Sequence, residues 1–215
     1  DILVLRTEHP LSAGLCKKVA NFCNVSPDAV FQSPDMPSIY QVPVCMQDQG
    51  IDRVILEKLG LPVGETPSLG PWRAFLDRRA NATEELHIGL VGKYDLQDAY
   101  KSIIEALQQA GVYNDRKVRC HFINAENITR ENVGKMLEGM AGYVICPGFG
   151  QRGTEGKLIA TQYCRENDLP TFGICLGMQM MVIEFARNVL GYTDANSTEL
   201  NSKTTHNVID IMEEQ

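Results

Sequence analysis

Apolar residues recur at two different spacings between residues 86 and 190, and these spacings predict strands and helices in alternation. Four short runs predict strands, at residues 86–91, 118–123, 143–146 and 169–174. Apolar residues three and four positions apart predict helices at residues 100–110, 133–140, 158–163 and 178–190, with Gly111 expected to end the first of these. Strands that alternate with helices in this way indicate an α/β fold, in which a parallel sheet is covered by helices on both faces.

The first 60 residues predict a smaller segment of strands and helices. Strands are expected near residues 2–5 and 29–31, and helices over residues 15–22 and 51–59. Residues 61–71 contain three prolines and two glycines, more than a helix or strand tolerates, and Pro71 is placed to start a short helix. The pattern therefore divides the chain into residues 1–60, a linker at residues 61–85 and a domain at residues 86–215.

The composition, 44% hydrophobic and 22% charged, is typical of a soluble globular protein, and no run of 18 apolar residues predicts a membrane span. A formal net charge of −7 argues against a broad nucleic-acid surface but permits a local basic pocket for a nucleotide. Seven cysteines without the basic start of a signal peptide predict reduced thiols and a cytoplasmic location. The four histidines are scattered, so we expect no metal site in this segment.

Residues 173–179, Gly-Ile-Cys-Leu-Gly-Met-Gln, hold the strongest candidate for chemistry. Cys175 lies at the predicted hinge between a strand and a helix, where a tight turn exposes a side chain at the carboxyl edge of a sheet. The helix dipole favours a thiolate there, and the backbone N–H of Leu176 is placed to stabilise an oxyanion. Gly173 and Gly177 leave room for the turn. For the other six cysteines we expect an inert core role.

A second oxyanion donor is expected in the Pro-Gly-Phe-Gly loop at residues 147–150, because Gly148 lets a backbone N–H approach a ligand. A plain turn between a strand and a helix has the same composition. Ligands of parallel sheets bind beyond the carboxyl ends of the strands, so this loop, residues 92–94 and Cys175 are expected to converge on one crevice. His206, the one histidine after Cys175, lies in a polar run without a carboxylate and is expected at the surface rather than as the general base.

The string at residues 173–179 resembles the nucleophile signature of class I glutamine amidotransferases, and longer strings resemble the CTP synthase family. They are Val-Gly-Lys-Tyr at 91–94, Asp-Ala-Tyr-Lys-Ser at 98–102, Pro-Gly-Phe-Gly at 147–150 and Ala-Asn-Ser-Thr-Glu at 195–199, with further matches at 1–6, 22–25 and 38–40. The match is loose only at residues 41–85. The resemblance implies a class I glutaminase-like domain, preceded by the carboxyl-terminal part of an α/β nucleotide-dependent synthetase domain. The chain is then expected to be an internal piece of a longer enzyme.

The resemblance implies a homo-tetrameric ligase of pyrimidine biosynthesis that aminates UTP to CTP, using ATP, Mg²⁺ and ammonia released from glutamine, with GTP as activator. It assigns Cys175 as the nucleophile, Leu176 and Gly148 to the oxyanion hole, and these two residues with Gln179 and Glu199 to glutamine binding. On the synthetase side it assigns nucleotide contacts to Arg6, Lys18, Asp35 and Met36. Without the resemblance, Arg6 and Lys18 would be interpreted as solvated surface charges.

The sequence departs from the family pattern in three respects. The phosphate-binding loop and Mg²⁺ carboxylates are absent, and so is the His-Pro-Glu segment that carries the base and its orienting acid. A single glycine precedes Phe149 where the family has two, and one residue is lacking between Tyr94 and Leu96. We expect each gap to be a mobile loop residue that is missing from this sequence, and not a true deletion. A chain of these residues alone is expected to turn over almost no glutamine.

Two other functions remain open at this point. The chain could be a catalytically incomplete regulatory or assembly module, which the missing segments favour. It could also be a stand-alone cysteine hydrolase of related α/β fold, although such a hydrolase needs no nucleotide-binding segment before it.

Overall fold

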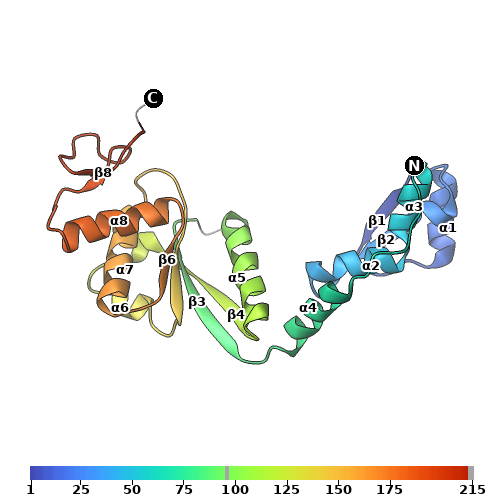
Figure 1. Ribbon diagram of the computed structural model, residues 1–215, viewed down its shortest axis with the longest axis horizontal. Coiled ribbons are helices and arrows are strands. Elements are labelled where there is room, and N and C mark those ends of the chain that lie inside the picture. The colour runs from blue at the N-terminus through green and yellow to red at the C-terminus, as the bar shows by residue number, and fades with distance from the viewer. Residues whose placement is uncertain (95–96, 213–215) are drawn as a thin grey trace. The chain divides into compact units, whose positions relative to one another are not determined.

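The computed structural model describes residues 1–94 and 97–212, and the chain divides into two compact units, Asp1–Asn81 and Ala82–Gln215 (Figure 1). The division falls inside the predicted linker at residues 61–85. The domain limits expected from the sequence stay a prediction, as does the assignment of the first segment to a synthetase domain.

The first unit is built on a two-stranded parallel sheet with four helices. Its elements are β1 (Leu3–Thr7), α1 (Ala13–Phe22), β2 (Val30–Pro34), α2 (Val42–Asp48), α3 (Ile51–Lys58) and α4 (Gly70–Asn81), with 3-10 helices at Pro27–Ala29 and Ile39–Gln41. β1 and β2 pair from Leu3–Val30 to Thr7–Pro34. The sequence pattern does not predict α2, because this helix buries no residue and therefore carries no apolar stripe.

Helix α4 packs on the first unit through an aromatic cluster. The indole Nε1 of Trp72 donates to the backbone oxygen of Tyr40 at 2.7 Å. The Trp72 ring stacks on Phe75 at 5.3 Å between centroids, and Tyr40 meets Phe75 edge-on at 5.5 Å. The short helix predicted from Pro71 is confirmed.

The second unit is built on a four-stranded parallel sheet in the order β4-β3-β5-β6. Its elements are β3 (Glu85–Gly92), α5 (Lys101–Tyr113), β4 (Lys117–Asn124), α6 (Val133–Met136), β5 (Gly142–Ile145), α7 (Thr154–Glu166), β6 (Thr171–Gly173), α8 (Leu176–Asn188), β7 (Asn196–Ser197) and β8 (Asn207–Ile209), with 3-10 helices at Gln97–Tyr100 and Ala125–Asn127. β7 and β8 form a separate parallel pair. The predicted α/β class is confirmed (Figure 1).

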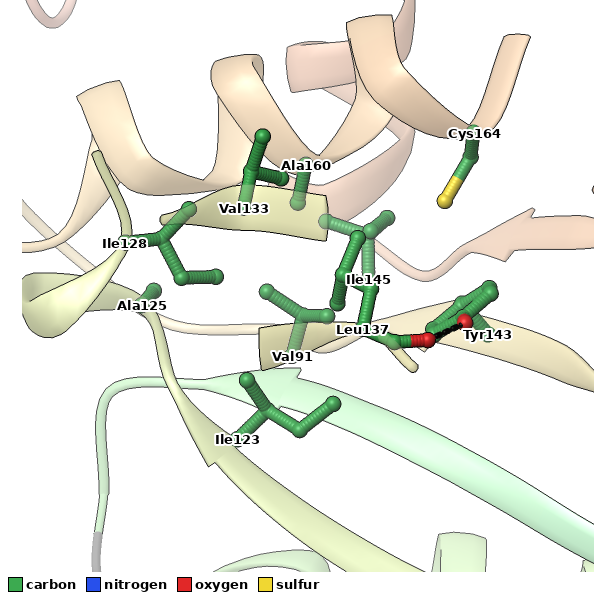
Figure 2. Close-up of a cluster of buried hydrophobic side chains, with 10 residues drawn as sticks. All are labelled: Val91, Ile123, Ala125, Ile128, Val133, Leu137, Tyr143, Ile145, Ala160 and Cys164. Atoms are coloured by element: carbon green, nitrogen blue, oxygen red, sulfur yellow. Dashed lines mark hydrogen bonds between the residues drawn. The ribbon is translucent and has the colours of Figure 1, made fainter. Parts of the chain in front are cut away.

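Helices cover both faces of this sheet because successive strand residues point to opposite sides. Leu90 and Val144 pack with residues of α5 on one face. Their neighbours Val91 and Ile145 pack on the other face with α6 and with Ala160 of α7 (Figure 2). The inner strands β3 and β5 are thus packed against helices on both sides, which is the reason that they read as apolar runs in the sequence.

Two details of the predicted helices are wrong. Gly111 does not end α5 but lies buried inside it, and a Cβ there would be 2.7 Å from Cγ2 of Val118 on β4. This glycine serves close packing of the helix on the strand rather than termination. The helix expected over residues 133–140 is short: α6 ends at Met136, and the following Leu137 accepts a hydrogen bond at its carbonyl from the Tyr143 hydroxyl (Figure 2).

Candidate active site

The loops that follow β3, β5 and β6 lie at one edge of the sheet, because these strands are parallel neighbours. The Cys146 N–H donates to the Val91 carbonyl at 2.9 Å, so the loop after β5 starts beside the end of β3. The Ile174 N–H donates to the Ile145 carbonyl at 3.0 Å, so the turn before α8 starts beside the end of β5. These loops therefore start side by side at one edge of the sheet, and the crevice expected there stays a prediction.

Cys175 is exposed on a tight turn between β6 and α8. Its backbone has φ of 52° and ψ of −113°, a left-handed conformation that residues with a side chain seldom adopt. A Cβ on Gly173 would lie 2.7 Å from the Met178 nitrogen, and one on Gly177 would overlap the Ile145 carbonyl oxygen. The turn is therefore closed by glycine on both sides, and it presents the sulfur at the N-terminus of α8, where the helix dipole favours a negative charge.

Backbone donors without acceptors lie on two of the loops at this edge, those after β5 and β6. Leu176 is the first residue of α8, and its N–H donates to no group among residues 1–94 and 97–212. The N–H groups of Gly148, Phe149 and Gly150 likewise have no acceptor in the described part of the chain. Unpaired amides next to an exposed thiol are the arrangement that stabilises an oxyanion.

Gln179 and Glu199 occupy different positions relative to this edge. Gln179 lies on the first turns of α8, and its side-chain Oε1 is buried without a partner among the described residues. Such an atom is costly unless a ligand supplies a donor. Glu199 is exposed, and its N–H donates to Ser197 Oγ at 3.2 Å. The adjacent Leu200 packs against the buried cluster that contains Leu176 and Met180, which brings this segment toward α8.

Two buried lysines beside the 146–150 loop were not found from the sequence. Lys93 follows β3 and is 2% exposed, and its Nζ donates to the carbonyls of Phe149 and Gly150. Lys157 lies on α7 and is fully buried, and its Nζ donates to the Cys146 carbonyl at 2.5 Å. The available signal was the position of Lys157 on the otherwise buried face of α7, where a lysine requires partners.

The remaining cysteines are free but not all inert core residues as expected. Cys146 and Cys164 are buried, and burial raises the pKa of Cys146 to about 12, which keeps it a thiol. Cys23 is exposed instead, because it lies at the solvent-exposed end of α1 beside the fully exposed Phe22. The core expectation is therefore wrong for Cys23.

His206 is partly exposed, as expected, yet it has a carboxylate partner that sequence reasoning missed. Its Nδ1 lies 2.5 Å from Oδ1 of Asp194, and its ring stacks on Tyr192 with centroids 4.5 Å apart. Hydrogen bonds from the Thr205 side chain and backbone, with one from His206, hold the Asp194 pKa well below its usual value. In the described part of the chain, His206 makes no hydrogen bond to Cys175.

In the first unit, the structure brings Arg6 and Asp35 together. The Arg6 guanidinium pairs with the Asp35 carboxylate and donates to the Thr7 carbonyl at 2.7 Å, although both side chains remain largely exposed. Met36 lines a cavity of about 850 Å³ that belongs wholly to this unit. Lys18 is exposed on α1 and forms no ion pair with the described residues. The nucleotide contacts assigned to these residues stay a prediction.

No cluster of three or more metal-ligating side chains occurs within residues 1–94 and 97–212. None of the helices that the structure describes combines the length and the apolar character that a membrane crossing requires. The sequence gap expected between Tyr94 and Leu96 lies outside the described residues.

Two family models match the chain: glutamine amidotransferase class-I over residues 95–214 and CTP synthase N-terminus over residues 1–61. Curated CTP synthases from Bacteroides thetaiotaomicron and Porphyromonas gingivalis are 68% and 57% identical to it, over 217 and 216 aligned positions. Each alignment covers 100% of this chain and 40% of the relative, so the chain spans less than half the length of these relatives.

A solved structure of the glutaminase domain of Trypanosoma brucei CTPS, with bound acivicin, is also similar. It is 38% identical, with a TM-score of 0.56, over 60% of this chain and 50% of that one. The resemblance inferred from the sequence motifs is thereby confirmed. The chain belongs to the class-I glutamine amidotransferase family, and its curated relatives are CTP synthases.

Proposed function

We propose that the second unit releases ammonia from glutamine through a thioester on Cys175, and that the protein containing this chain uses this ammonia to aminate UTP to CTP. One observation carries the proposal. An exposed sulfur stands on a left-handed backbone turn at a helix N-terminus, beside backbone N–H groups that have no acceptor in the described chain. The amination of UTP is proposed from the likeness to CTP synthases.

In the proposed chemistry, the Cys175 thiolate attacks the side-chain carbonyl carbon of glutamine. The oxyanion that forms accepts hydrogen bonds from the Leu176 N–H and the Gly148 loop. Collapse of this intermediate breaks the C–N bond, and the nitrogen takes up a proton and leaves as ammonia. Water then attacks the γ-glutamyl thioester, which releases glutamate and restores the thiol. The resemblance places the general base in a His-Pro-Glu run that does not occur in this sequence.

Gln179 and Glu199 suit the recognition of the free amino acid. The unpartnered Gln179 Oε1 accepts a hydrogen bond from a substrate donor, which removes the cost of its burial. The exposed Glu199 carboxylate receives the substrate α-ammonium. A shorter amide without this ammonium is then a poor substrate, because it leaves Glu199 without its partner.

The first unit is proposed to contribute part of a nucleotide site. The cationic side chains of Lys18 and Arg6 fit contacts with phosphate groups, and Asp35 and Met36 lie at the same edge as Arg6. ATP with Mg²⁺, when bound, supplies the phosphoryl group that activates UTP. The contacts proposed for the described residues of this unit are to the phosphates and the base of the nucleotide.

Activation by GTP, a homo-tetrameric assembly and a cytoplasmic location complete the proposal. They rest on the likeness to CTP synthases and, for the location, on seven cysteines that are all free. The regulatory module and the stand-alone hydrolase are not favoured, because both halves of the chain align with CTP synthases.

A chloromethyl ketone analogue of glutamine tests the glutaminase proposal. The thiolate displaces chloride and forms a thioether, which peptide mass spectrometry locates. We expect labelling of Cys175 that L-glutamine suppresses, whereas the exposed Cys23 provides the matched control and stays unlabelled. Iodoacetamide, which needs no substrate pocket, is expected to label both residues. Equal labelling of Cys23 and Cys175 by the analogue, or labelling that glutamine does not suppress, contradicts the proposal.

A further inference from the structure

The carbonyl groups of the loop after β5 are held by two buried ammonium groups. Nζ of Lys93 donates to the carbonyl of Phe149 and, at 3.0 Å, to that of Gly150. Nζ of Lys157 donates to the carbonyl of Cys146 at 2.5 Å and lies 3.5 Å from that of Pro147. The lysines approach from different elements, one from the end of β3 and the other from α7.

These contacts determine where the amide N–H groups of the loop point. In a trans peptide unit the carbonyl oxygen of one residue and the N–H of the next lie on opposite sides of the chain. The chain has no cis peptide bond among its described residues. Because Lys157 Nζ donates to the Pro147 carbonyl, the Gly148 N–H points away from Lys157. Because Lys93 draws the Phe149 carbonyl, the Gly150 N–H points away from Lys93.

The same N–H groups are those without acceptors. Neither the Gly148 nor the Gly150 N–H donates to any group that the structure describes. The two lysines thus bind the carbonyls of Cys146, Pro147, Phe149 and Gly150, whereas the Gly148 and Gly150 N–H groups remain without acceptors in the described chain. An oxyanion hole requires such free donors.

We propose that Lys93 and Lys157 are positioning residues, which set the direction of the amide donors of the 146–150 loop and so form one side of the oxyanion hole. This inference rests on the proposed glutaminase function of Cys175. Neither lysine touches the substrate: each acts through the loop carbonyls that it binds.

Packing and charge support the assignment. A Cβ on Gly148 would lie only 2.6 Å from Cε of Lys93, so glycine at this position lets the lysine pass under the loop. Burial lowers the pKa of Lys157 to about 8, and the nearby positive charge of Lys93 adds to that shift. The Lys157 Nζ is satisfied within this site by its hydrogen bond to the Cys146 carbonyl.

Three variants of the full-length protein test the inference. Lys93→Met removes the ammonium and keeps most of the side-chain volume, Lys93→Arg keeps a donor, and Lys135→Met removes an exposed lysine of the same unit as the matched control. The measurements are kcat and KM of glutamine hydrolysis and the rate of Cys175 alkylation by iodoacetamide. Alkylation displaces iodide and forms no oxyanion, so a misdirected loop does not slow it.

We expect Lys93→Met to lower kcat about 100-fold, the usual effect of losing one oxyanion donor, while KM and the alkylation rate stay at their wild-type values. Lys93→Arg should recover part of kcat, and Lys135→Met should match the wild type. An unchanged kcat in Lys93→Met overturns the inference and leaves the proposed function intact. A joint loss of kcat, alkylation and stability shows a purely structural role and also overturns it. A wild-type protein that does not hydrolyse glutamine overturns both proposals.

Discussion

At the scale of single residues, Cys175 combines an exposed sulfur with a strained backbone. Its φ of 52° and ψ of −113° are accessible to glycine but unfavourable for a residue with a Cβ. Such conformations cost about 1–3 kcal/mol each and persist only where the surrounding structure enforces them. Here the ends of β5 and β6 and the start of α8 enforce it, so the thiol is displayed at the expense of stability.

This strain predicts that Cys175→Gly is more stable than Cys175→Ala by about 1–3 kcal/mol, because glycine alone relieves the left-handed conformation. Neither variant retains the nucleophile, so the comparison isolates the backbone. Urea unfolding of the two variants, followed by circular dichroism, measures the difference. Equal unfolding midpoints for the glycine and alanine variants would show that the turn is unstrained.

Functional residues that interact with their neighbours in sequence can be predicted from the sequence. Residues that interact with distant parts of the chain cannot. Cys175 and its flanking glycines are close in sequence, so the seven residues 173–179 are enough to predict their role. Lys93 and Lys157 are different, because the carbonyls that they bind lie 56 and 11 residues away. Asp194 and His206 are 12 residues apart, and no sequence motif predicts that they interact.

At the scale of elements, the position of α8 depends on its close approach to β5. A side chain at Gly177 would overlap the carbonyl oxygen of Ile145, so the first turn of the helix rests directly on the strand end. The same contact places the Leu176 N–H beside the loop that follows β5. The close approach of α8 to β5 at Gly177 is therefore also a requirement for the geometry of the proposed oxyanion hole.

Gly177→Ala is expected to destabilise the second unit by about 1–3 kcal/mol, because overpacking forces α8 away from β5. The labelling of Cys175 by the glutamine analogue should fall at the same time. Gly64→Ala is the control, since a Cβ at Gly64 meets nothing within 4 Å. Thermal unfolding and labelling that match this control would contradict the described approach of α8 to β5.

The β7–β8 segment depends on the Asp194 carboxylate. It accepts hydrogen bonds from Thr205 Oγ1 at 2.6 Å and from the Thr205 N–H at 2.7 Å, and it contacts His206. These bonds lower the Asp194 pKa below its ordinary value of 3.8. Their stabilisation is therefore complete above that value and disappears as the pH falls through the lower pKa of the folded state.

The prediction is that acid loosens this segment in the wild type more steeply than in Asp194→Asn, which has no carboxyl group to protonate. Hydrogen exchange of the Asn196 N–H, which donates to the His206 carbonyl at 3.1 Å, reports the loosening between pH 5 and pH 2 at about one-unit steps. The same pH dependence in both proteins would show that Asp194 does not hold the segment.

Element types follow from the sequence more reliably than element ends. The inner strands β3 and β5 pack against helices on both faces and read as apolar runs. The edge strands β4 and β6 are partly exposed, yet their apolar residues still predict them. Helix α2 escapes prediction because it buries nothing, and α6 is overpredicted because the apolar residues after Met136 pack as an irregular segment. Gly111 shows that a glycine near the end of a helical pattern can mark either the end of the helix or a site of close packing.

At the scale of the whole molecule, the two units carry different parts of the proposed reaction. The nucleophile and its amide donors lie in the second unit, and Arg6, Lys18 and Asp35 lie in the first. The order of these parts agrees with the two matched families, with the CTP synthase N-terminus model before the glutamine amidotransferase model. The aligned region is 40% of the length of the curated relatives, and the amination of UTP stays a proposal.

The central claim is that Cys175 supplies nitrogen from glutamine and takes no part in the use of that nitrogen. The most direct measurement is CTP formation from UTP and ATP by the full-length protein and its Cys175→Ala variant, with either glutamine or ammonium as the nitrogen source. We expect the variant to lose the glutamine-dependent reaction by several orders of magnitude and to keep the ammonium-dependent one. CTP formation from glutamine at the wild-type rate by Cys175→Ala would contradict the account.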